Sequence, residues 1–207
     1  MKIASESSTT WPALTGAGTQ NLLRLRLERL GALDAAKQWG APVHRLYGRT
    51  TGGRTVMDLR YAKIGKDVQG LGLHRAALFT ALNNGMTASG AKLVLGFEVA
   101  KIKDTSAPRL VARDGRVEGP FDLVVDCAGA HDTLRKSLDV PQNDPVYPWG
   151  CLWAILPDRT GAFEGELRQV CESTQIMIGI LPVGRVPGAE ADVNHVALFW
   201  SLLHKQY

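Results

Sequence analysis

The residues best suited to chemistry follow one short apolar run. Residues 122–125 (DLVV) are typical of a strand buried on both faces, and the run ends at Asp126. Small residues follow as far as Gly129, so the backbone can bend there and approach a ligand closely. Asp132 then has the position of a helix cap. A strand, a glycine turn with a carboxylate and a helix start make the crevice in which open α/β sheets hold nucleotides or flavins; a purely structural turn is the alternative interpretation.

Metal and nucleophilic chemistry find little support in the same sequence. The His and Cys residues show no metal-ligand spacing, and there is no GxSxG turn. His74 and His131 are polar candidates for acid or base chemistry, but a helix cap or a surface position explains each of them better. The sequence therefore assigns no catalytic residue and no metal site.

Composition excludes several classes of protein. The formal net charge is +4, and because the basic residues are scattered, no nucleic-acid partner is predicted. No apolar run reaches the roughly 18 residues that span a bilayer, so no membrane association is predicted. The first ten residues lack the apolar core of a secretion signal, and Cys127, Cys151 and Cys171 show no CxxC spacing. We expect a cytoplasmic protein.

The elements that must position these residues are predicted to alternate between helix and strand. Residues 1–15 are polar and are expected to be disordered. The glycines at 16–18 are not preceded by the buried strand that a dinucleotide-binding loop requires. The apolar spacing predicts helices within 21–39 and 74–83. A hairpin with its turn at residues 51–53 is predicted within 43–61, and a second hairpin with its turn at Asp114-Gly115 within 109–118. Residues 92–103 are predicted to form a strand with a bulge at Gly96.

A change of composition after residue 138 predicts a domain boundary. Pro141, Pro145 and Pro148 lie close together there. The rest of the chain is rich in β-branched and aromatic residues, which predicts an antiparallel sheet with one face closing a pocket. The predicted fold class is α/β, with a Rossmann-like domain at 16–140 and a domain built on an antiparallel β-sheet at 141–207.

Several passages, taken in order, resemble the FAD-dependent monooxygenases of the para-hydroxybenzoate hydroxylase type. They are ERLGALDAA, GLGLHRAALFTAL, VLGFEVAKI, DGRVEGPFDLVVDCAG, GILPVGR and VALFWSL. The resemblance implies a flavin-binding α/β domain and a substrate domain whose antiparallel sheet covers the flavin ring. It also implies an oxidoreductase that uses FAD, NAD(P)H and O₂ to hydroxylate an aromatic or similar small molecule.

The resemblance also implies roles for individual residues. Arg75 matches the helix-start position that contacts the ribityl or phosphate region of FAD, and Val99 matches a strand position beside the adenine. Asp126 and Gly129 lie in the second flavin motif, although Ala128 occupies the place of the usual aspartate. For the substrate pocket we expect the aromatic side chains Trp153, Phe199 and Trp200, with a role as core aromatics as the alternative.

The chain departs from the family pattern at two places. The N-terminal strand with its glycine-rich turn and the later Gly-Asp motif are both missing, which suggests an incomplete copy of the fold. We therefore expect marginal stability, weak or absent FAD binding and a complementing flavin-domain segment as a partner. Two alternatives remain open: a non-catalytic remnant or interaction module of the same fold, and a related dehydrogenase or halogenase-like flavoprotein. For the halogenase, no lysine-bearing motif is visible.

Overall fold

A computed structural model describes residues 24–66, 68–129, 134–137, 145, 147–173, 175–190 and 192–203. The chain divides into two compact units. The first, here called the sheet unit, combines residues 1–90 with 147–207, and the second, the small unit, consists of residues 91–146. The predicted disorder of residues 1–15 and the roles considered for His131 and Asp132 lie outside the described residues.

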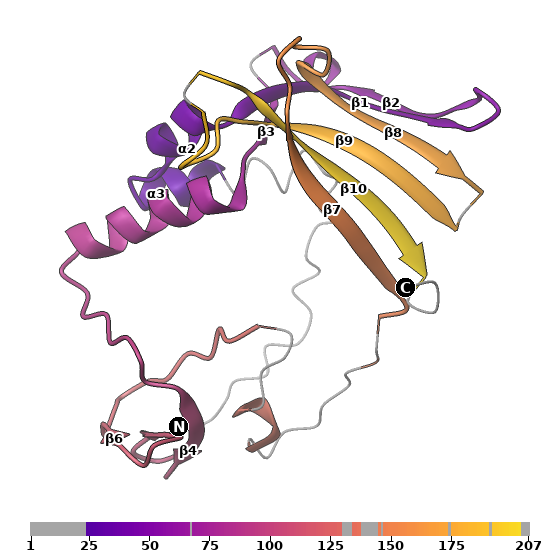
Figure 1. Ribbon diagram of the computed structural model, residues 1–207. Helices are drawn as coiled ribbons and strands as arrows, with labels where there is room; N and C mark the ends of the chain where they lie inside the picture. The colour runs from indigo at the N-terminus through magenta and orange to yellow at the C-terminus, as the bar shows by residue number, and fades with distance from the viewer. Residues whose placement is uncertain are drawn as a thin grey trace. The chain divides into compact units, whose positions relative to one another are not determined.

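A seven-stranded mixed sheet dominates the sheet unit (Figure 1). Six strands follow the order β2-β1-β8-β9-β10-β7. The short β3 pairs with the first three residues of β1. β1 and β8 run parallel, and the other pairs are antiparallel. The strands are β1 (Ala41–Thr50), β2 (Thr55–Arg60), β3 (Gly70–Gly72), β7 (Trp149–Pro157), β8 (Gly165–Glu172), β9 (Ile176–Gly184) and β10 (His195–Leu203).

The parallel pairing of β1 with β8 differs from the domain division expected from the sequence. That division put β1 and β8 in separate domains, at 16–140 and 141–207. In the structure, Leu46 pairs with Leu167 and Gly48 with Gln169, so both segments belong to one sheet. The segment from residue 147 onward adds strands to a sheet already begun by β1, because strands far apart in sequence can still share a ladder.

The first hairpin of the sheet confirms the turn predicted at residues 51–53. Gly53 has φ +86°, which glycine adopts without the steric cost that other residues meet. The amide of Thr50 donates to the carbonyl of Arg54 at 2.8 Å and closes the turn. Register then places Asp58 of β2 opposite Tyr47 of β1, next to Arg45.

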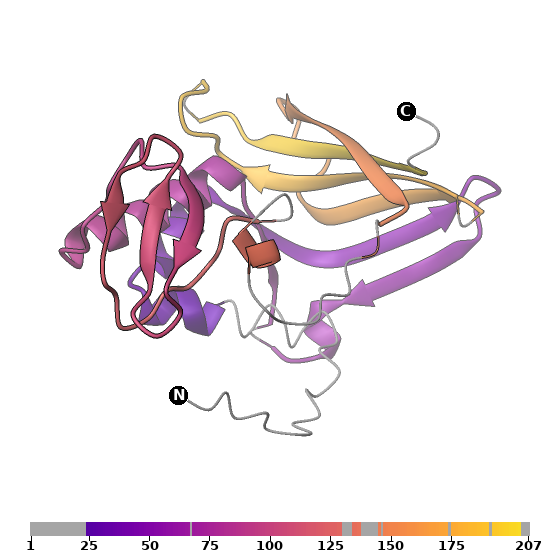
Figure 2. The ribbon, with the colours of Figure 1, turned by 90° about the horizontal axis from the view of Figure 1, so that it is seen from below.

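Two helices lie at the β3 end of the sheet, as Figures 1 and 2 show. They are α2 (Leu33–Trp39) and α3 (Arg75–Ala88), which correspond to the predicted helices. Leu27, Ala32, Ala36 and Ala81 form a buried cluster between the helical segments. The small side chains of this cluster allow the helices to approach each other closely.

The small unit contains a three-stranded antiparallel sheet and a short 3₁₀ helix. The strands are β4 (Val99–Lys103), β5 (Arg109–Ala112) and β6 (Val117–Glu118), and the 3₁₀ helix is η2 (Leu134–Ser137). The hairpin predicted at Asp114-Gly115 is confirmed, because β5 and β6 flank this turn. Gly115 has φ +91°, and Asp114 accepts a hydrogen bond from the amide of Arg116 at 3.1 Å.

The strand predicted at residues 122–125 is absent from the structure, and the strand predicted from residue 92 begins only at Val99. Leu123 and Val125 are 70% and 72% exposed, while Val124 between them is half-buried. Within the described ranges, no segment forms a ladder with residues 122–125. An apolar run becomes a strand only when neighbouring backbone groups pair with it, so the sequence pattern alone could not decide this point.

Candidate functional site

Two of the aromatic residues expected in the substrate pocket lie side by side on one face of the large sheet. Trp153 of β7 pairs with Phe199 of β10, so both side chains point to the same side, here called the aromatic face. Trp200 is the next residue along β10 and therefore points to the opposite side. The expectation of one pocket containing all three residues is corrected accordingly: Trp153 and Phe199 share a face, and Trp200 does not.

Gly179 of β9 makes room for Phe199 on the aromatic face. The two residues are paired across β9 and β10, and a Cβ added at Gly179 would lie 2.1 Å from an atom of the Phe199 ring. The ring therefore lies directly against the β9 backbone. Sequence reasoning missed Gly179, although an isolated glycine within a strand is a signal for such a close approach.

Arg75 joins the aromatic face from the start of α3. Its guanidinium carbon lies 5.0 Å from the centre of the Trp153 ring, which is the geometry of a cation–π contact. The preceding residue, His74, accepts a hydrogen bond from the amide of Ala76 at 3.2 Å through Nδ1 and caps the helix. The structure thus confirms His74 as a cap and brings Arg75, predicted to bind the cofactor, into contact with Trp153, predicted to bind the substrate.

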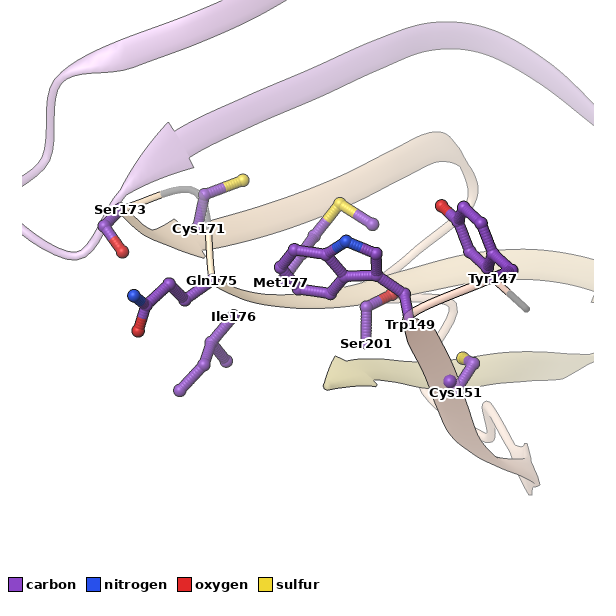
Figure 3. Close-up of a pocket in the computed structure, with 10 residues that line it drawn as sticks. Tyr147, Trp149, Cys151, Cys171, Ser173, Gln175, Ile176, Met177 and Ser201 are labelled. Carbon is purple, nitrogen blue, oxygen red and sulfur yellow. The ribbon is translucent and has the colours of Figure 1, made fainter. Parts of the chain in front are cut away.

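A pocket of about 460 Å³ lies on the aromatic face, at the end of the sheet where β7 begins and β10 ends (Figure 3). Cys151, Ser201, Met177 and Cys171 are successive register partners across β7, β10, β9 and β8, so all four point into it. We call it the Trp149 pocket. Its lining residues are Tyr147, Trp149, Gly150, Cys151, Cys171, Ser173, Gln175, Ile176, Met177 and Ser201.

The side chains around the Trp149 pocket are polarisable or neutral polar groups. Figure 3 shows the indole of Trp149 lying across the pocket beside Met177, with Tyr147 at one end and Gln175 at the other. The amide nitrogen of Gln169, on the same face of β8, lies 3.0 Å from the Met177 sulfur and holds that side chain in place. This pocket was not predicted, because its residues come from four strands whose order the sequence does not reveal.

Two of the residues predicted to bind the cofactor line a separate cavity within the small unit. Val99 and Asp126 both border this space of about 390 Å³, together with Phe97, Glu98, Leu110, Val124, Val125, Cys127, Ala128 and Leu134. Asp126 accepts a hydrogen bond from the amide of Ala128 at 2.9 Å through Oδ1, while Oδ2 accepts none from the described residues. Gly129 has φ +92° and follows the cavity without lining it.

The cavity in the small unit fits part of FAD rather than the whole cofactor. Its volume lies near the lower end of the range for small-molecule sites, roughly 300–1,000 Å³, so a base with its ribose is of suitable size. Phe97, Val99 and Leu110 give it apolar walls for a base, and Asp126 offers a carboxylate oxygen for ribose hydroxyl groups. Glu98 is already engaged, since it accepts a hydrogen bond from Arg113 at 2.8 Å.

The opposite face of the large sheet carries a network of ion pairs. Arg45 donates hydrogen bonds to both carboxylate oxygens of Asp58, at 2.7 and 3.0 Å. The guanidinium carbon of Arg45 also lies 4.3 Å from the centre of the Tyr47 ring. Glu166 lies 3.6 Å from Arg45 and 3.4 Å from Arg168. The hydrogen bond from Arg45 lowers the pKa of Asp58 and raises the pKa of Arg45. Arg45 thus links β1 to β2 through Asp58 and to β8 through Glu166.

The described part of the chain shows neither a metal-binding cluster nor a membrane-spanning helix. Among those residues, no group of three or more His, Cys, Asp or Glu side chains is placed to hold a metal ion. No helix formed by these residues is long and apolar enough to cross a membrane.

No protein-family model matches the sequence, and no curated protein matches it. Solved structures, however, share its fold, and one of them, PqsL of Pseudomonas aeruginosa, is a probable FAD-dependent monooxygenase. PqsL of P. aeruginosa, crystallised as a mutant, has a TM-score of 0.71 at 16% identity, over 88% of this chain and 48% of its own. The tetrameric form of 2-methyl-3-hydroxypyridine-5-carboxylic acid oxygenase has a TM-score of 0.68 at 22% identity, with 90% and 47% covered. Klebsiella pneumoniae HpxO, complexed with FAD, has a TM-score of 0.65 at 16% identity, with 87% and 46% covered.

These likenesses define the fold of the chain. Its α/β architecture, with a large mixed sheet and a smaller antiparallel sheet, is shared with these solved structures, and the predicted fold class is confirmed. The chain spans about half the length of the solved structures that it matches.

Proposed function

We propose that this chain is part of a FAD-dependent monooxygenase that hydroxylates an aromatic or similar small molecule with NAD(P)H and O₂. The observation that carries the proposal is the meeting of Arg75, Trp153 and Phe199 on one sheet face, in a fold shared with FAD-dependent monooxygenases. The aromatic face offers rings for an aromatic substrate, and Arg75 offers a cation beside them.

Each predicted site residue has a task in this proposal. Val99 and Asp126 bind the adenosine end of FAD, through apolar contact and a ribose hydrogen bond respectively. Arg75 binds an anionic group of the cofactor with its guanidinium, for which phosphate oxygens are well-matched acceptors. Trp153 and Phe199 lie on the sheet face against which the substrate binds. Bound FAD would supply the redox chemistry, taking a hydride from the nicotinamide and reacting with O₂.

The proposal includes a complementing polypeptide segment that completes the flavin domain. Leu93 and Leu95 are 56% and 79% exposed, and Leu123 and Val125 are 70% and 72% exposed. Apolar runs of this kind are typical of strands in a parallel sheet covered on both faces. A cytoplasmic location is proposed as well, because Cys127, Cys151 and Cys171 are all free thiols.

FAD binding by the folded 207-residue chain tests this function. We expect saturable but weak binding by fluorescence polarisation, with a Kd of roughly 10 µM to 1 mM, and slow FAD-dependent oxidation of NAD(P)H. Asp126→Ala and Arg75→Gln should each weaken FAD binding at least fivefold, whereas the control Arg168→Gln, on the opposite sheet face, should not. A chain purified with one tightly bound FAD would contradict the expected weakness.

The exposed apolar segment at 122–125 also supports a second candidate function, a non-catalytic interaction module that no longer binds FAD. The two candidates differ in the same assay. A folded chain that neither binds FAD nor oxidises NAD(P)H would overturn the monooxygenase proposal and support the interaction module.

A further inference from the structure

We propose that the substrate of this site is an uncharged aromatic molecule, held in the Trp149 pocket. This inference rests on the proposed function and names the substrate class of the same sheet face. It follows from three observations: which groups line the pocket, how far from it Arg75 contacts the aromatic face, and which polar groups are left for a ligand.

The lining of the Trp149 pocket favours an aromatic ring. Trp149 and Tyr147 present ring surfaces, and Met177 lies beside the indole (Figure 3). Thioether and thiol sulfur atoms are polarisable and make favourable contacts with aromatic rings. The volume of about 460 Å³ suits a ligand of one or two rings.

The described residues that line the Trp149 pocket offer no formal charge to an anionic ligand. None of its lining residues, all within the described part of the chain, is an Asp, Glu, Lys, Arg or His. Moving a carboxylate out of water without a cation to pair with it is costly. The pocket therefore favours a neutral ligand over an acid of the same shape.

Arg75 contacts the aromatic face at Trp153, which is too far from Trp149 for its charge to neutralise an acid in this pocket. It contacts Trp153, which is four residues from Trp149 in the same strand. At roughly 3.3 Å per residue, the two Cα positions are about 13 Å apart. Because Arg75 is also absent from the pocket lining, its charge acts at the Trp153 end of the face.

The remaining polar groups are those that recognise neutral substituents. Ser201 lies on the floor of the pocket between Cys151 and Met177, and Gln175 and the Tyr147 hydroxyl lie at its two ends. Hydroxyl and amide groups both donate and accept hydrogen bonds, so they suit phenol, amide or ketone substituents. The substrate class is therefore an uncharged ring carrying such a substituent.

A matched pair of ligands tests this inference without flavin or turnover. 4-Hydroxybenzamide and 4-hydroxybenzoate are close in size and differ in charge at pH 7.5. Titration of the folded chain by calorimetry should show at least tenfold tighter binding of the amide. Equal or tighter binding of the acid, or binding of neither compound, would overturn the proposal. Because FAD is not present, failure here is distinct from failure of the FAD-binding assay.

Three variants locate the binding. Trp149→Ala should reduce the affinity for the amide at least tenfold, whereas Trp200→Ala, on the opposite face of the sheet, should leave it unchanged. Gln175→Lys, in the turn before β9, should raise the affinity for the acid at least fivefold by supplying the missing cation. If Gln175→Lys leaves the acid unaffected, or if Trp200→Ala removes amide binding, the ligand does not occupy the Trp149 pocket and the inference is wrong.

Discussion

Arg75, at the start of α3, contacts the ring of Trp153 on the sheet. Because the contact involves only these two side chains, its contribution to stability can be measured by mutating them. The guanidinium lies 5.0 Å from the ring centre of Trp153, and both side chains are exposed, Trp153 by 52%. The expected strength of such an exposed cation–π pair is about 0.5–1 kcal/mol. The contact therefore orients Arg75 more than it stabilises the fold.

A double-mutant cycle tests the pair. Arg75→Gln and Trp153→Leu should each lower the free energy of unfolding in urea, and the double variant should lower it by less than the sum of the two. We expect a coupling of about 0.5–1 kcal/mol. Arg75→Lys should retain part of it, because the ammonium group keeps the charge. A coupling of zero would mean that the two side chains do not interact in solution.

Asp58 should make stability depend on pH. Its pKa is lowered in the folded state by the hydrogen bond from Arg45, so the folded state holds the carboxylate form more strongly than the unfolded state does. This stabilisation is present above the ordinary carboxyl pKa of Asp and is lost as pH falls through the lower folded value. Asp58→Asn should destabilise the chain at pH 7, and the difference from the parent should shrink toward pH 2. A difference independent of pH would contradict the assignment.

Among the elements, β3 approaches β9 so closely that only glycine fits at the contact. A Cβ added at Gly72 would lie 1.8 Å from the carbonyl oxygen of Pro182, a backbone atom that cannot rotate away. The short β3 thus brings the start of α3, and with it Arg75, to this end of the sheet. Close backbone contact here positions a residue of the site.

Gly72→Ala should therefore destabilise the sheet unit. The backbone must shift to relieve the contact, and overpacking of this kind costs roughly 1–3 kcal/mol. Chemical denaturation followed by circular dichroism measures the change. Gly52→Ala is the matched control, since its new Cβ would have only the Thr50 hydroxyl oxygen nearby, at 3.8 Å. Equal losses for the two variants would show that the Pro182 contact does not limit packing.

At the scale of the whole molecule, the two units differ in how their backbones are paired. β9 and β10 lie inside the large sheet with a neighbouring strand on each side. The segments at 91–98 and 121–129 belong to no described ladder, and several of their apolar side chains are exposed. Opening of such segments requires little free energy, because few contacts are lost.

Hydrogen exchange should reveal this difference. Amides of β9 and β10 should exchange slowest, and amides at 91–98 and 121–129 should exchange within the earliest time points. Mass spectrometry of the peptides obtained by digesting the labelled chain gives both rates in one experiment. Protection at 122–125 equal to that of β10 would mean that this segment is a paired strand, as the sequence pattern had predicted.

The predictions that succeeded from the sequence are local in origin. The turn at Asp114-Gly115, the hairpin turn before Arg54 and the cap at His74 each depend on residues within a few positions of one another. Backbone conformation at glycine and short-range hydrogen bonds decide such features, so a sequence specifies them directly. The same holds for the aromatic character of β7 and β10, which pointed to Trp153 and Phe199.

Only the tertiary structure decided which distant segments meet. The parallel pairing of β1 with β8 and the lack of a described partner for residues 122–125 depend on backbone groups far apart in sequence. The separation of Trp200 from Phe199 follows from strand alternation once β10 has its two neighbours, and the Trp149 pocket exists only where four strands end together. The physical reason is that a strand's partners and its covered face are set by the whole sheet, whereas its own residues set only its tendency to be a strand.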